Sequence, residues 1–374
     1  MMIATVIIGL VYLATLLYFA NGYKKVSLLT FKEAPPKVGF SIIIPFRNED
    51  RRLQPLLASL LELSYPSELL EVLFIDDAST DDSVNTINTV LKHAPFSYRI
   101  LKNQLDSQSP KKAAITLGIS KAQFDWILTT DADCKLPDTW LGAFNAIINS
   151  ESPDFIAAPV RFGIEPISGF LSHFAQNEAF AILVTTIGSY GHDAPILSNG
   201  ANLAYKKVWF NQVRGFEGNN HIASGDDVFM LQKAIASDAN IAYLKSPLAV
   251  VQTKTESSLK GFLSQRIRWA SKTTAVKNRA ATMAAAIIVL TNLWFLTLFV
   301  AIFFASINSW YFAIFAIFKM IVDLWYISKV DNVMSTVPSR HFGLVQIMYP
   351  LVILFVILGS LLGGYKWKGR GFKK

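Results

Sequence analysis

The chain has 374 residues, a formal net charge of +8 and 52% hydrophobic residues, with a mean hydropathy of +0.36. This length has room for one soluble domain and a membrane portion, and the hydropathy is high for a purely soluble protein. The single cysteine, Cys134, excludes an intramolecular disulfide and a Cys-rich metal site, which fits a reducing compartment. The positive charge is spread along the chain without any nucleic-acid-binding signature, so we expect a membrane surface as partner and no nucleic acid.

Four apolar runs are each about long enough to cross a hydrocarbon core of roughly 30 Å. They are residues 1–20, 281–306, 311–328 and 344–363. We expect an N-terminal transmembrane anchor at 1–20 and a C-terminal transmembrane region at 281–363 with about three hydrophobic segments. A cleaved signal peptide is the alternative for the first run. No Lys or Arg precedes that run, and Lys24 and Lys25 follow it, which favours a retained anchor with its C-terminal end in the cytoplasm.

Residues 37–255, between the anchor and the C-terminal region, alternate strand and helix patterns. Apolar and β-branched runs typical of buried parallel strands occur at 40–45, 69–75, 98–101 and 125–130. Helical patterns follow the first three of these runs and end near residues 63, 91 and 122. The alternation predicts a cytoplasmic α/β domain with a mostly parallel sheet. Past residue 150 the pattern is less regular, with a candidate strand at 155–162 and a long helical or flexible stretch at 164–191.

The fourth of these runs leads into Asp131-Ala132-Asp133. Two carboxylates at the carboxyl end of a strand face the crevice in which open α/β sheets bind ligands. Hard oxygen ligands of this kind suit Mg²⁺ or Mn²⁺ carrying a diphosphate. A solvated loop is the alternative for an isolated Asp-x-Asp, but the other motifs of the chain favour the binding site.

Two further acidic pairs are candidates for ligand binding, and each also lies just before an expected helix. Asp76-Asp77 follows the second strand, and Asp226-Asp227 stands in a turn that feeds a helix, near the positive end of the helix dipole. The alternative for both pairs is a helix-capping role. For the first pair, Asp81 is equally able to cap the helix.

Residues 257–277 form an amphipathic pattern that suits a helix lying in the membrane interface. An apolar stripe runs along it, and the basic side chains, Arg266 among them, are expected mostly outside that stripe. Gln265, Arg268 and Trp269 stand at i, i+3 and i+4, so one helix face presents all three. In the third apolar run, Lys319 and Asp323 are four residues apart, which indicates either a paired polar span or a re-entrant element.

Five of these signals occur in a fixed order along residues 40–269. They are IIIPFRNE at 42–49, FIDDASTDD at 74–82, TTDAD at 129–133, GDD at 225–227 and QRIRW at 265–269. The set resembles the membrane-bound members of glycosyltransferase family 2, which include ceramide glucosyltransferases and cellulose and hyaluronan synthases. Each motif alone is weak evidence, whereas five in order are strong. The resemblance implies a GT-A fold flanked by transmembrane helices.

The resemblance also implies how the donor is bound. The loop with Pro45, Arg47 and Glu49, together with Asp76 and Asp77, would hold the nucleotide. Lys111 would offset phosphate charge, with Lys112 an equal candidate because the family usually has Asn where Thr116 stands. Asp131 and Asp133 would bind the metal and diphosphate, with Asp131 also contacting the donor.

The remaining implied roles concern the reaction itself. Asp227 matches the general base, with Asp226 as its rival because two adjacent carboxylates push each other's pKa apart. Gln265 and Arg268 would close over the donor diphosphate, and Trp269 would offer a platform for the acceptor.

We therefore expect an inverting, metal-dependent glycosyltransferase in the cytoplasmic membrane, moving a sugar from a nucleotide-sugar, in particular a UDP-sugar, to a lipid or lipid-linked acceptor. Two alternatives remain. One is a processive polysaccharide synthase of the same family, and the other is a catalytically silent scaffold that binds sugar nucleotides.

Overall fold

The computed structural model describes residues 1–29, 35–103, 107–164, 169–222, 224–271, 278–304, 308–334, 341–362, 365–367 and 370–372. The chain divides into two compact units, which are described separately. The α/β unit comprises Ser27–Pro166 and Leu197–Lys254, and the helical unit comprises Met1–Val26, Ile167–Ile196 and Thr255–Lys374. The segment Ile167–Ile196 falls inside the range 37–255 expected for the catalytic domain, so the chain leaves the α/β unit once and returns to it.

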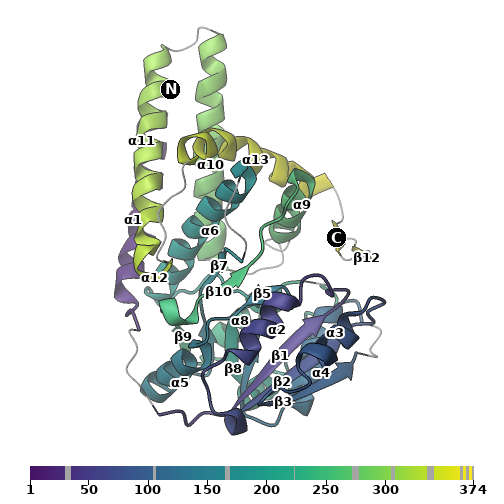
Figure 1. Cartoon of the computed structure of the whole chain (residues 1–374). Helices are drawn as coiled ribbons and strands as arrows, with labels where there is room; N and C mark the ends of the chain where they lie inside the picture. The colour runs from purple at the N-terminus through teal and green to yellow at the C-terminus, as the bar shows by residue number, and fades with distance from the viewer. Residues whose placement is uncertain are drawn as a thin grey trace. The chain divides into compact units, whose positions relative to one another are not determined.

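The α/β unit is built on a seven-stranded sheet with the order β3-β2-β1-β4-β8-β6-β9 (Figure 1). Its strands are β1 (Phe40–Phe46), β2 (Leu70–Asp76), β3 (Ser97–Lys102), β4 (Trp126–Thr129), β6 (Phe155–Ala157), β8 (Leu203–Lys206) and β9 (Ile241–Tyr243). Neighbouring strands pair in parallel except at β8, which is antiparallel to both β4 and β6. The predicted mostly parallel sheet is confirmed, and β8 is a strand that the sequence pattern did not indicate.

A smaller sheet has the order β5-β10-β7, formed by Cys134–Lys135, Val251–Thr253 and Val160–Phe162. The expectation of one strand over 155–162 is therefore wrong, because β6 and β7 belong to different sheets. Pro159 lies between them and has no backbone N–H to donate to a ladder. Its carbonyl oxygen instead accepts from the backbone nitrogen of Val251 at 3.1 Å, at the entry to β10.

Helices cover both faces of the large sheet. They are α2 (Gln54–Leu61), α3 (Ser83–Val90), α4 (Pro110–Lys121), α5 (Trp140–Glu151), α7 (Lys207–Gln212) and α8 (Asp226–Ala236), with short 3₁₀ turns at Ser67–Leu69 and Pro247–Ala249. Ile42 and Ile44 join a core with apolar residues of α2, α3 and α5. Ile43 points to the other face, where a Cβ at Gly118 of α4 would lie 2.7 Å from its Cγ2 atom. Burial on both faces explains why the centre of β1, residues 42–44, is an apolar run rather than an alternating pattern.

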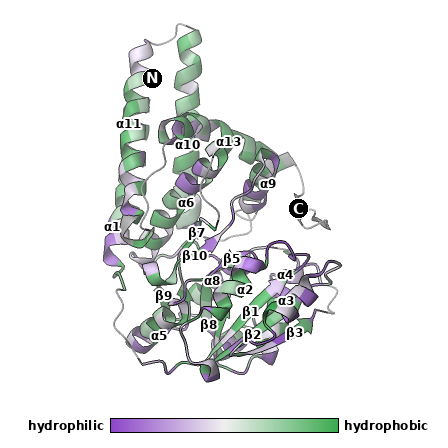
Figure 2. Ribbon diagram, viewed as in Figure 1, coloured by the Kyte–Doolittle hydropathy of each residue, from purple (hydrophilic) through white to green (hydrophobic). Residues whose placement is uncertain are grey.

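The helical unit contains α1 (Met2–Lys25), α6 (Gly169–Tyr190), α9 (Leu259–Ala270), α10 (Arg279–Phe303), α11 (Ser309–Ile327), α12 (Asp331–Met334) and α13 (Phe342–Leu362), followed by the strands β11 (Tyr365–Trp367) and β12 (Arg370–Phe372). Among the described residues, four helices are long and apolar enough to cross a membrane, namely α1, α10, α11 with the turn that follows it, and α13. Figure 2 shows that they are apolar over most of their length. The four predicted apolar segments are helical over their described residues, and the chain is associated with a membrane.

Small residues let α1 and α6 approach closely. A Cβ built at Gly188 would lie 2.1 Å from the carbonyl oxygen of Phe19, and one at Gly22 would lie 2.0 Å from the carbonyl oxygen of Gly188. Such distances leave room only for hydrogen, as in other close helix crossings. The crossing attaches α6 to the first candidate transmembrane helix.

A buried polar cluster joins three helices of the same unit. Lys319 on α11 donates to Asp323 at 2.7 Å and to Gln346 of α13 at 2.8 Å, and the hydroxyl of Tyr12 on α1 donates to Asp323. Because α11 is continuous through both charged residues, the structure has the paired polar span rather than a re-entrant element.

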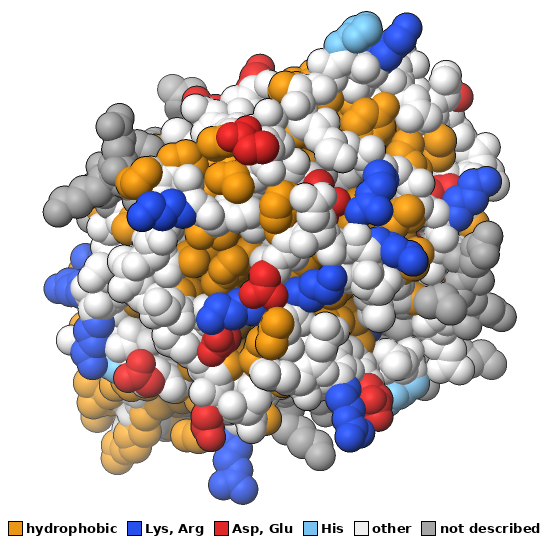
Figure 3. All heavy atoms as spheres, turned by 90° about the horizontal axis from the view of Figure 1, so that it is seen from below, with side chains coloured by type: hydrophobic (Ala, Val, Ile, Leu, Met, Phe, Trp, Pro, Cys, Tyr) orange, Lys and Arg blue, Asp and Glu red, His pale blue; other side chains and the backbone are white. Residues whose placement is uncertain are grey.

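Charges are mixed on the face of the molecule seen in Figure 3. Lys and Arg side chains are interspersed there with Asp and Glu side chains and with apolar ones. The net charge of +8 is therefore not gathered into one basic patch on that face.

Candidate active site

The carboxyl ends of β1, β2 and β4 lie at one edge of the sheet. In the ladders, Phe46 is opposite Asp76 and Ile43 is opposite Thr129. The backbone nitrogen of Asp77 continues the pairing by donating to Phe46 at 2.9 Å. The residues that follow these strands therefore share the edge at which open α/β sheets bind ligands.

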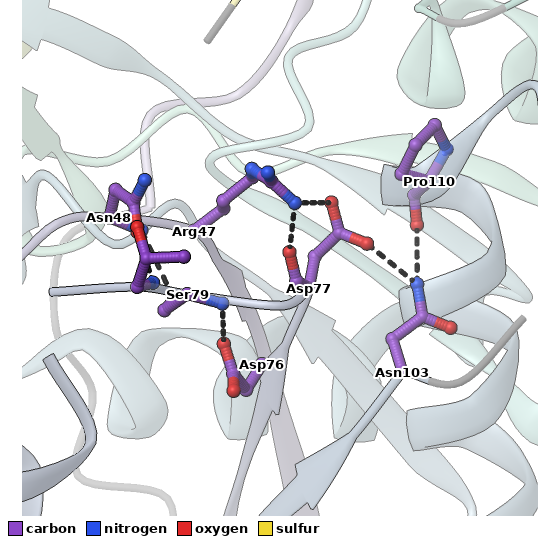
Figure 4. Close-up of polar contacts among 8 residues, drawn as sticks. Arg47, Asn48, Asp76, Asp77, Ser79, Asn103 and Pro110 are labelled. Carbon is purple, nitrogen blue, oxygen red and sulfur yellow. Dashed lines mark hydrogen bonds and ion pairs between the residues drawn. The ribbon is translucent and has the colours of Figure 1, made fainter. Parts of the chain in front are cut away.

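Asp77 is held in place by the ends of two neighbouring elements (Figure 4). The Nη1 atom of Arg47 donates to the Asp77 carbonyl oxygen at 2.6 Å and lies 3.8 Å from its carboxylate. The amide of Asn103 donates to the same carboxylate at 3.1 Å and to the Pro110 carbonyl oxygen at 3.3 Å, at the start of α4. Asn103 was not among the predicted site residues, and its only signal was its position directly after β3.

Asp76 orders the turn that follows β2. Its carboxylate accepts from the backbone nitrogen of Ser79 at 2.8 Å, and the Ser79 hydroxyl accepts from the backbone nitrogen of Asn48 at 3.1 Å (Figure 4). Asn48 and Ala78 both have a positive φ, 52° and 58°, as the paired turns require. Hydrogen bonds between side chains and backbone groups thus join the loops after β1 and β2.

The capping alternative for Asp76-Asp77 does not match the contacts at α3. Asp81 accepts from the Ser83 backbone nitrogen at 3.1 Å and from its hydroxyl at 2.6 Å, and also from the Asp50 backbone nitrogen at 3.0 Å. Burial opposes ionisation of this carboxyl, but these hydrogen bonds outweigh it and hold the pKa of Asp81 below its usual range. Asp81 therefore holds the start of α3 through Ser83. Asp76 and Asp77 are not needed as caps of that helix and remain at the end of β2.

Pro45 and Glu49 bracket the loop after β1. Pro45 is the half-buried residue of β1 before the buried Phe46, and Glu49 is buried at 5% exposure. The Glu49 backbone nitrogen donates to the hydroxyl of Ser83 at 2.9 Å, and its carbonyl oxygen accepts from Leu53 at 3.0 Å. The loop, with Arg47 between Pro45 and Glu49, therefore precedes α2.

Lys111 lies between two of the predicted carboxylates. Its Nζ atom is 2.8 Å from Asp131, which follows β4, and 3.1 Å from Asp226, which begins α8. Burial lowers the pKa of Lys111, but the attraction of Asp131 and Asp226 outweighs burial and raises that pKa above its ordinary value. Lys111 is therefore a permanent positive charge that joins three segments distant in sequence.

Lys112, the alternative to Lys111, points elsewhere. Its Nζ atom donates to the carbonyl oxygens of Asn219 and Ile222 at 2.8 and 2.9 Å, and it lies 4.4 Å from the centre of the Phe229 ring. At 1% exposure, Lys112 holds the segment before α8 against the domain. Lys111 is the one that lies with the carboxylates.

Asp226 and Asp227 have different surroundings. A Cβ at Gly200 would lie 2.6 Å from Oδ2 of Asp226 and 3.4 Å from Nζ of Lys111, so Gly200 leaves space for that ion pair. Asp227 accepts instead from the backbone nitrogens of Gly200 at 3.3 Å and Val228 at 2.8 Å. Asp226 faces a full cation, and Asp227 accepts from the backbone of Gly200, which lies outside α8, as well as from that of Val228, so neither acts only as a helix cap.

The two carboxylates that the sequence predicts as metal ligands, Asp131 and Asp133, follow β4 at this edge. Asp131 is 37% exposed on its side chain, and Asp133 follows it in the turn before β5. Among the residues that the structure describes, there is no group of three or more His, Cys, Asp or Glu placed to hold a metal. The Asp131 carboxylate faces the Lys111 ammonium at 2.8 Å, so the described side chains supply at most part of a ligand set for a divalent cation.

The QRIRW residues lie on α9 in the helical unit. Gln265 is half-buried, and Trp269 keeps 37% of its surface exposed. Arg266 is buried at 5% exposure, so the expectation that it lies outside the buried stripe is wrong. The reason is an acidic partner, Glu178 of α6, which sequence periodicity cannot reveal. Residues 272–277 of the predicted amphipathic helix lie outside the described residues.

Comparisons with known proteins agree with this geometry. The model of the family described as Glycosyl transferase family 2 matches residues 41–192, and the model described as Glycosyl transferase family group 2 matches residues 126–358. The chain is 26% identical over 246 residues to the poly-beta-1,6-N-acetyl-D-glucosamine synthase of Staphylococcus epidermidis, covering 65% of this chain and 57% of that protein. It is 22% identical over 238 residues to a probable glycosyltransferase of Bacillus subtilis, covering 63% and 54%. The chain thus spans a little over half the length of these curated relatives.

A solved structure matches over nearly the whole chain. It is a mannosyltransferase from Pyrobaculum calidifontis in complex with GDP-Man and Mn²⁺, with a TM-score of 0.65 and 16% identity, covering 96% of this chain and 98% of that one. At this identity the likeness concerns the fold alone, and it confirms the expected GT-A fold.

Proposed function

The chain is a member of glycosyltransferase family 2, and we propose that it is an inverting, metal-dependent enzyme that transfers a sugar from a nucleotide-sugar to a membrane-bound acceptor. The observation that carries the proposal is the convergence of Lys111, Asp131 and Asp226 beside Asp227 at the carboxyl edge of the sheet. A silent scaffold would have no need for a base next to such a charge-balanced cluster.

The nucleotide lies, in this proposal, against the loops after β1 and β2. Asp77 is already oriented by Arg47 and Asn103, so its carboxylate can accept from a base or ribose without reorganisation. We propose a UDP-sugar as donor, which agrees with the N-acetylglucosamine named in the relatives' activity. Pro45 and Glu49 shape the same loop.

The diphosphate lies against Lys111, Asp131 and Asp133. When bound there, Mg²⁺ or Mn²⁺ supplies positive charge that stabilises the departing nucleoside diphosphate. Lys111 contributes a second positive charge that needs no ion, since its raised pKa keeps it protonated. The Mn²⁺ of the mannosyltransferase from Pyrobaculum calidifontis supports a cation of this kind.

Asp227 is the general base. It would take the proton from the acceptor hydroxyl as that oxygen attacks the anomeric carbon from the face opposite the diphosphate, which inverts the configuration. Asp226 is a poorer candidate because its carboxylate is already engaged in the ion pair with Lys111, at 3.1 Å.

The acceptor is a lipid or lipid-linked molecule that stays in the membrane. The amphipathic α9 carries Gln265, Arg268 and Trp269 and is followed by the first candidate membrane span after the domain. A lipid bound at headgroup depth keeps its tail in the bilayer, where each buried CH₂ is worth roughly 0.8 kcal/mol. We propose that the enzyme lies in the cytoplasmic membrane with its α/β unit in the cytoplasm, and the lysines at the end of α1, Lys24 and Lys25, support this orientation.

A processive polysaccharide synthase is the second candidate, favoured by the names of the first curated relatives. One experiment separates the two. Membranes containing the protein are incubated with a panel of radiolabelled nucleotide sugars and extracted with organic solvent. We expect a discrete labelled band in the organic phase, whereas label only in long water-soluble polymer would favour the synthase.

The base is tested in the same assay. Asp227→Asn should lower turnover by about 10² or more while donor binding is kept, because the variant preserves shape but cannot accept the proton. Near-normal turnover would reject Asp227 and direct attention to Asp226. No labelling with any donor by the wild-type protein would support the scaffold.

A further inference from the structure

Arg266 is the most buried side chain of α9 apart from Phe262, among the described residues of that helix. Its guanidinium points to α6 within the helical unit. Its Nε and Nη2 atoms both donate to one carboxylate oxygen of Glu178, at 2.8 and 2.5 Å. A planar guanidinium bonded through two adjacent N–H groups is fixed in orientation as well as in position.

The same guanidinium contacts Gln265 and Trp269, two of the residues proposed to bind substrate. Its Nη1 atom donates to the side-chain oxygen of Gln265. Its central carbon lies 4.7 Å from the centre of the Trp269 ring and 4.0 Å from that of Phe262. Phe262 in turn packs edge-on against Phe174 of α6, with ring centres 5.4 Å apart.

These contacts determine what Gln265 and Trp269 can offer a ligand. Because the amide oxygen of Gln265 is engaged by Arg266, the amide presents N–H donors, which suit a hydroxyl or phosphate oxygen. Because the guanidinium stacks on one face of Trp269, the other face is the one that a sugar ring can cover. Trp269 retains 37% exposure, so part of the indole is accessible.

We propose that Glu178 and Arg266 are positioning residues that set the orientation of Gln265 and Trp269 for the acceptor. The inference rests on the proposed function, in which Gln265 and Trp269 contact substrate. Neither Glu178 nor Arg266 touches substrate in this arrangement. A role restricted to joining α6 and α9 would need only the ion pair, whereas the contacts to Gln265 and Trp269 give Arg266 a second task.

The experiment uses the full-length protein, labelled with 5-fluorotryptophan and reconstituted in lipid nanodiscs. Trp269→Phe identifies the ¹⁹F resonance of Trp269. Glu178→Gln removes the charge that orients Arg266, and Arg266→Lys keeps the charge but loses the planar stack and the forked donors. We expect both variants to shift or broaden the Trp269 resonance while the other tryptophan resonances stay in place.

Matched controls come from an exposed ion pair in the α/β unit. Arg214 and Glu217 are 3.7 Å apart with side chains 77% and 65% exposed, so Arg214→Lys and Glu217→Gln make the same chemical changes far from α9 in sequence. These controls should leave the Trp269 resonance unchanged. If Glu178→Gln does not fold, Glu178→Asp keeps the charge, shortens the reach by one methylene, and should perturb the resonance in the same direction.

Transfer is measured in parallel with radiolabelled UDP-N-acetylglucosamine as the first donor probe. We expect Glu178→Gln and Arg266→Lys to lower kcat/KM for the membrane acceptor by about tenfold, with donor KM changed less. An unchanged Trp269 resonance in both variants would overturn the inference, even if the thermal midpoint falls. If the Trp269 resonance responds in Glu178→Gln and Arg266→Lys but Trp269→Phe transfers sugar normally, the positioning of Trp269 is upheld and its proposed role in acceptor binding is rejected.

Discussion

Removing the positive charge of Lys111 should destabilise the α/β unit and increase its response to divalent cations. The Lys111 ammonium lies 2.8 Å from Asp131 and 3.1 Å from Asp226, so the two carboxylate oxygens are at most about 5.9 Å apart, the sum of these distances. At an effective dielectric constant of about 20, two negative charges at that distance repel by roughly 2.8 kcal/mol. Asp131 is 37% exposed, so solvent screening reduces the expected penalty in Lys111→Met to about 1–2 kcal/mol.

Thermal unfolding of the full-length protein measures this penalty. For a unit of this size, 1 kcal/mol corresponds to about 2–4 °C, so we expect the midpoint of Lys111→Met to fall by about 2–8 °C. Mn²⁺ should raise the midpoint of the variant more than that of the wild type, because the freed carboxylates then compete for a cation. Lys121→Met, at the exposed end of the same helix, is the matched control. A midpoint equal to that of the control, together with an unchanged Mn²⁺ response, would refute the reasoning.

Three further predictions follow from single contacts. Gly200→Ala should lower turnover about tenfold in the transfer assay, because its methyl would lie 2.6 Å from Asp226 and force the Lys111 ion pair apart; full activity would contradict this. Gly188→Ala should lower the thermal midpoint of the detergent-solubilised protein by several degrees, because the new methyl would lie 2.1 Å from the Phe19 carbonyl oxygen. An unchanged midpoint would show that α1 and α6 can separate without cost. Burial raises the pKa of Asp154, but the hydrogen bonds that its carboxylate accepts from Lys206 at 2.8 Å and from the Asn240 backbone outweigh burial and lower that pKa. The ionised carboxylate therefore stabilises the fold above the ordinary pKa of Asp, and this stabilisation is lost as the pH falls through the lowered pKa. Asp154→Asn should therefore cost about 0.5–1 kcal/mol at pH 7 and progressively less as the pH falls below the ordinary pKa of Asp, and a pH-independent difference would disprove the link.

The sequence by itself determined the parts of the fold that depend on local pattern. Strands buried on both faces are mostly apolar, so β1 and β2 were visible as apolar runs. Parallel connections put the carboxyl ends of such strands at one edge, and Asp77 and Asp131 follow two strands of that edge. The four candidate membrane helices were equally readable, because length and hydropathy suffice to recognise them.

Only the tertiary structure decided the contacts between segments far apart along the chain. Lys111 and Lys112 are neighbours on α4, and successive residues of a helix point about 100° apart, so one reaches Asp131 and the other reaches Asn219. Which of them does so depends on how α4 packs on the sheet, and no local pattern records that. The antiparallel β8 was missed for a similar reason, since its place between β4 and β6 is set by strands on either side of it.

Arg266 is the clearest case of a contact that depends on a distant segment of the chain. A charged residue in an amphipathic helix is expected on the polar face, because burying an unbalanced charge costs more than the apolar stripe gains. Glu178, 88 residues earlier on another helix, supplies the opposite charge and reverses that preference. The pattern of a single helix contains no information about such a partner, whereas the packing of α6 against α9 supplies it.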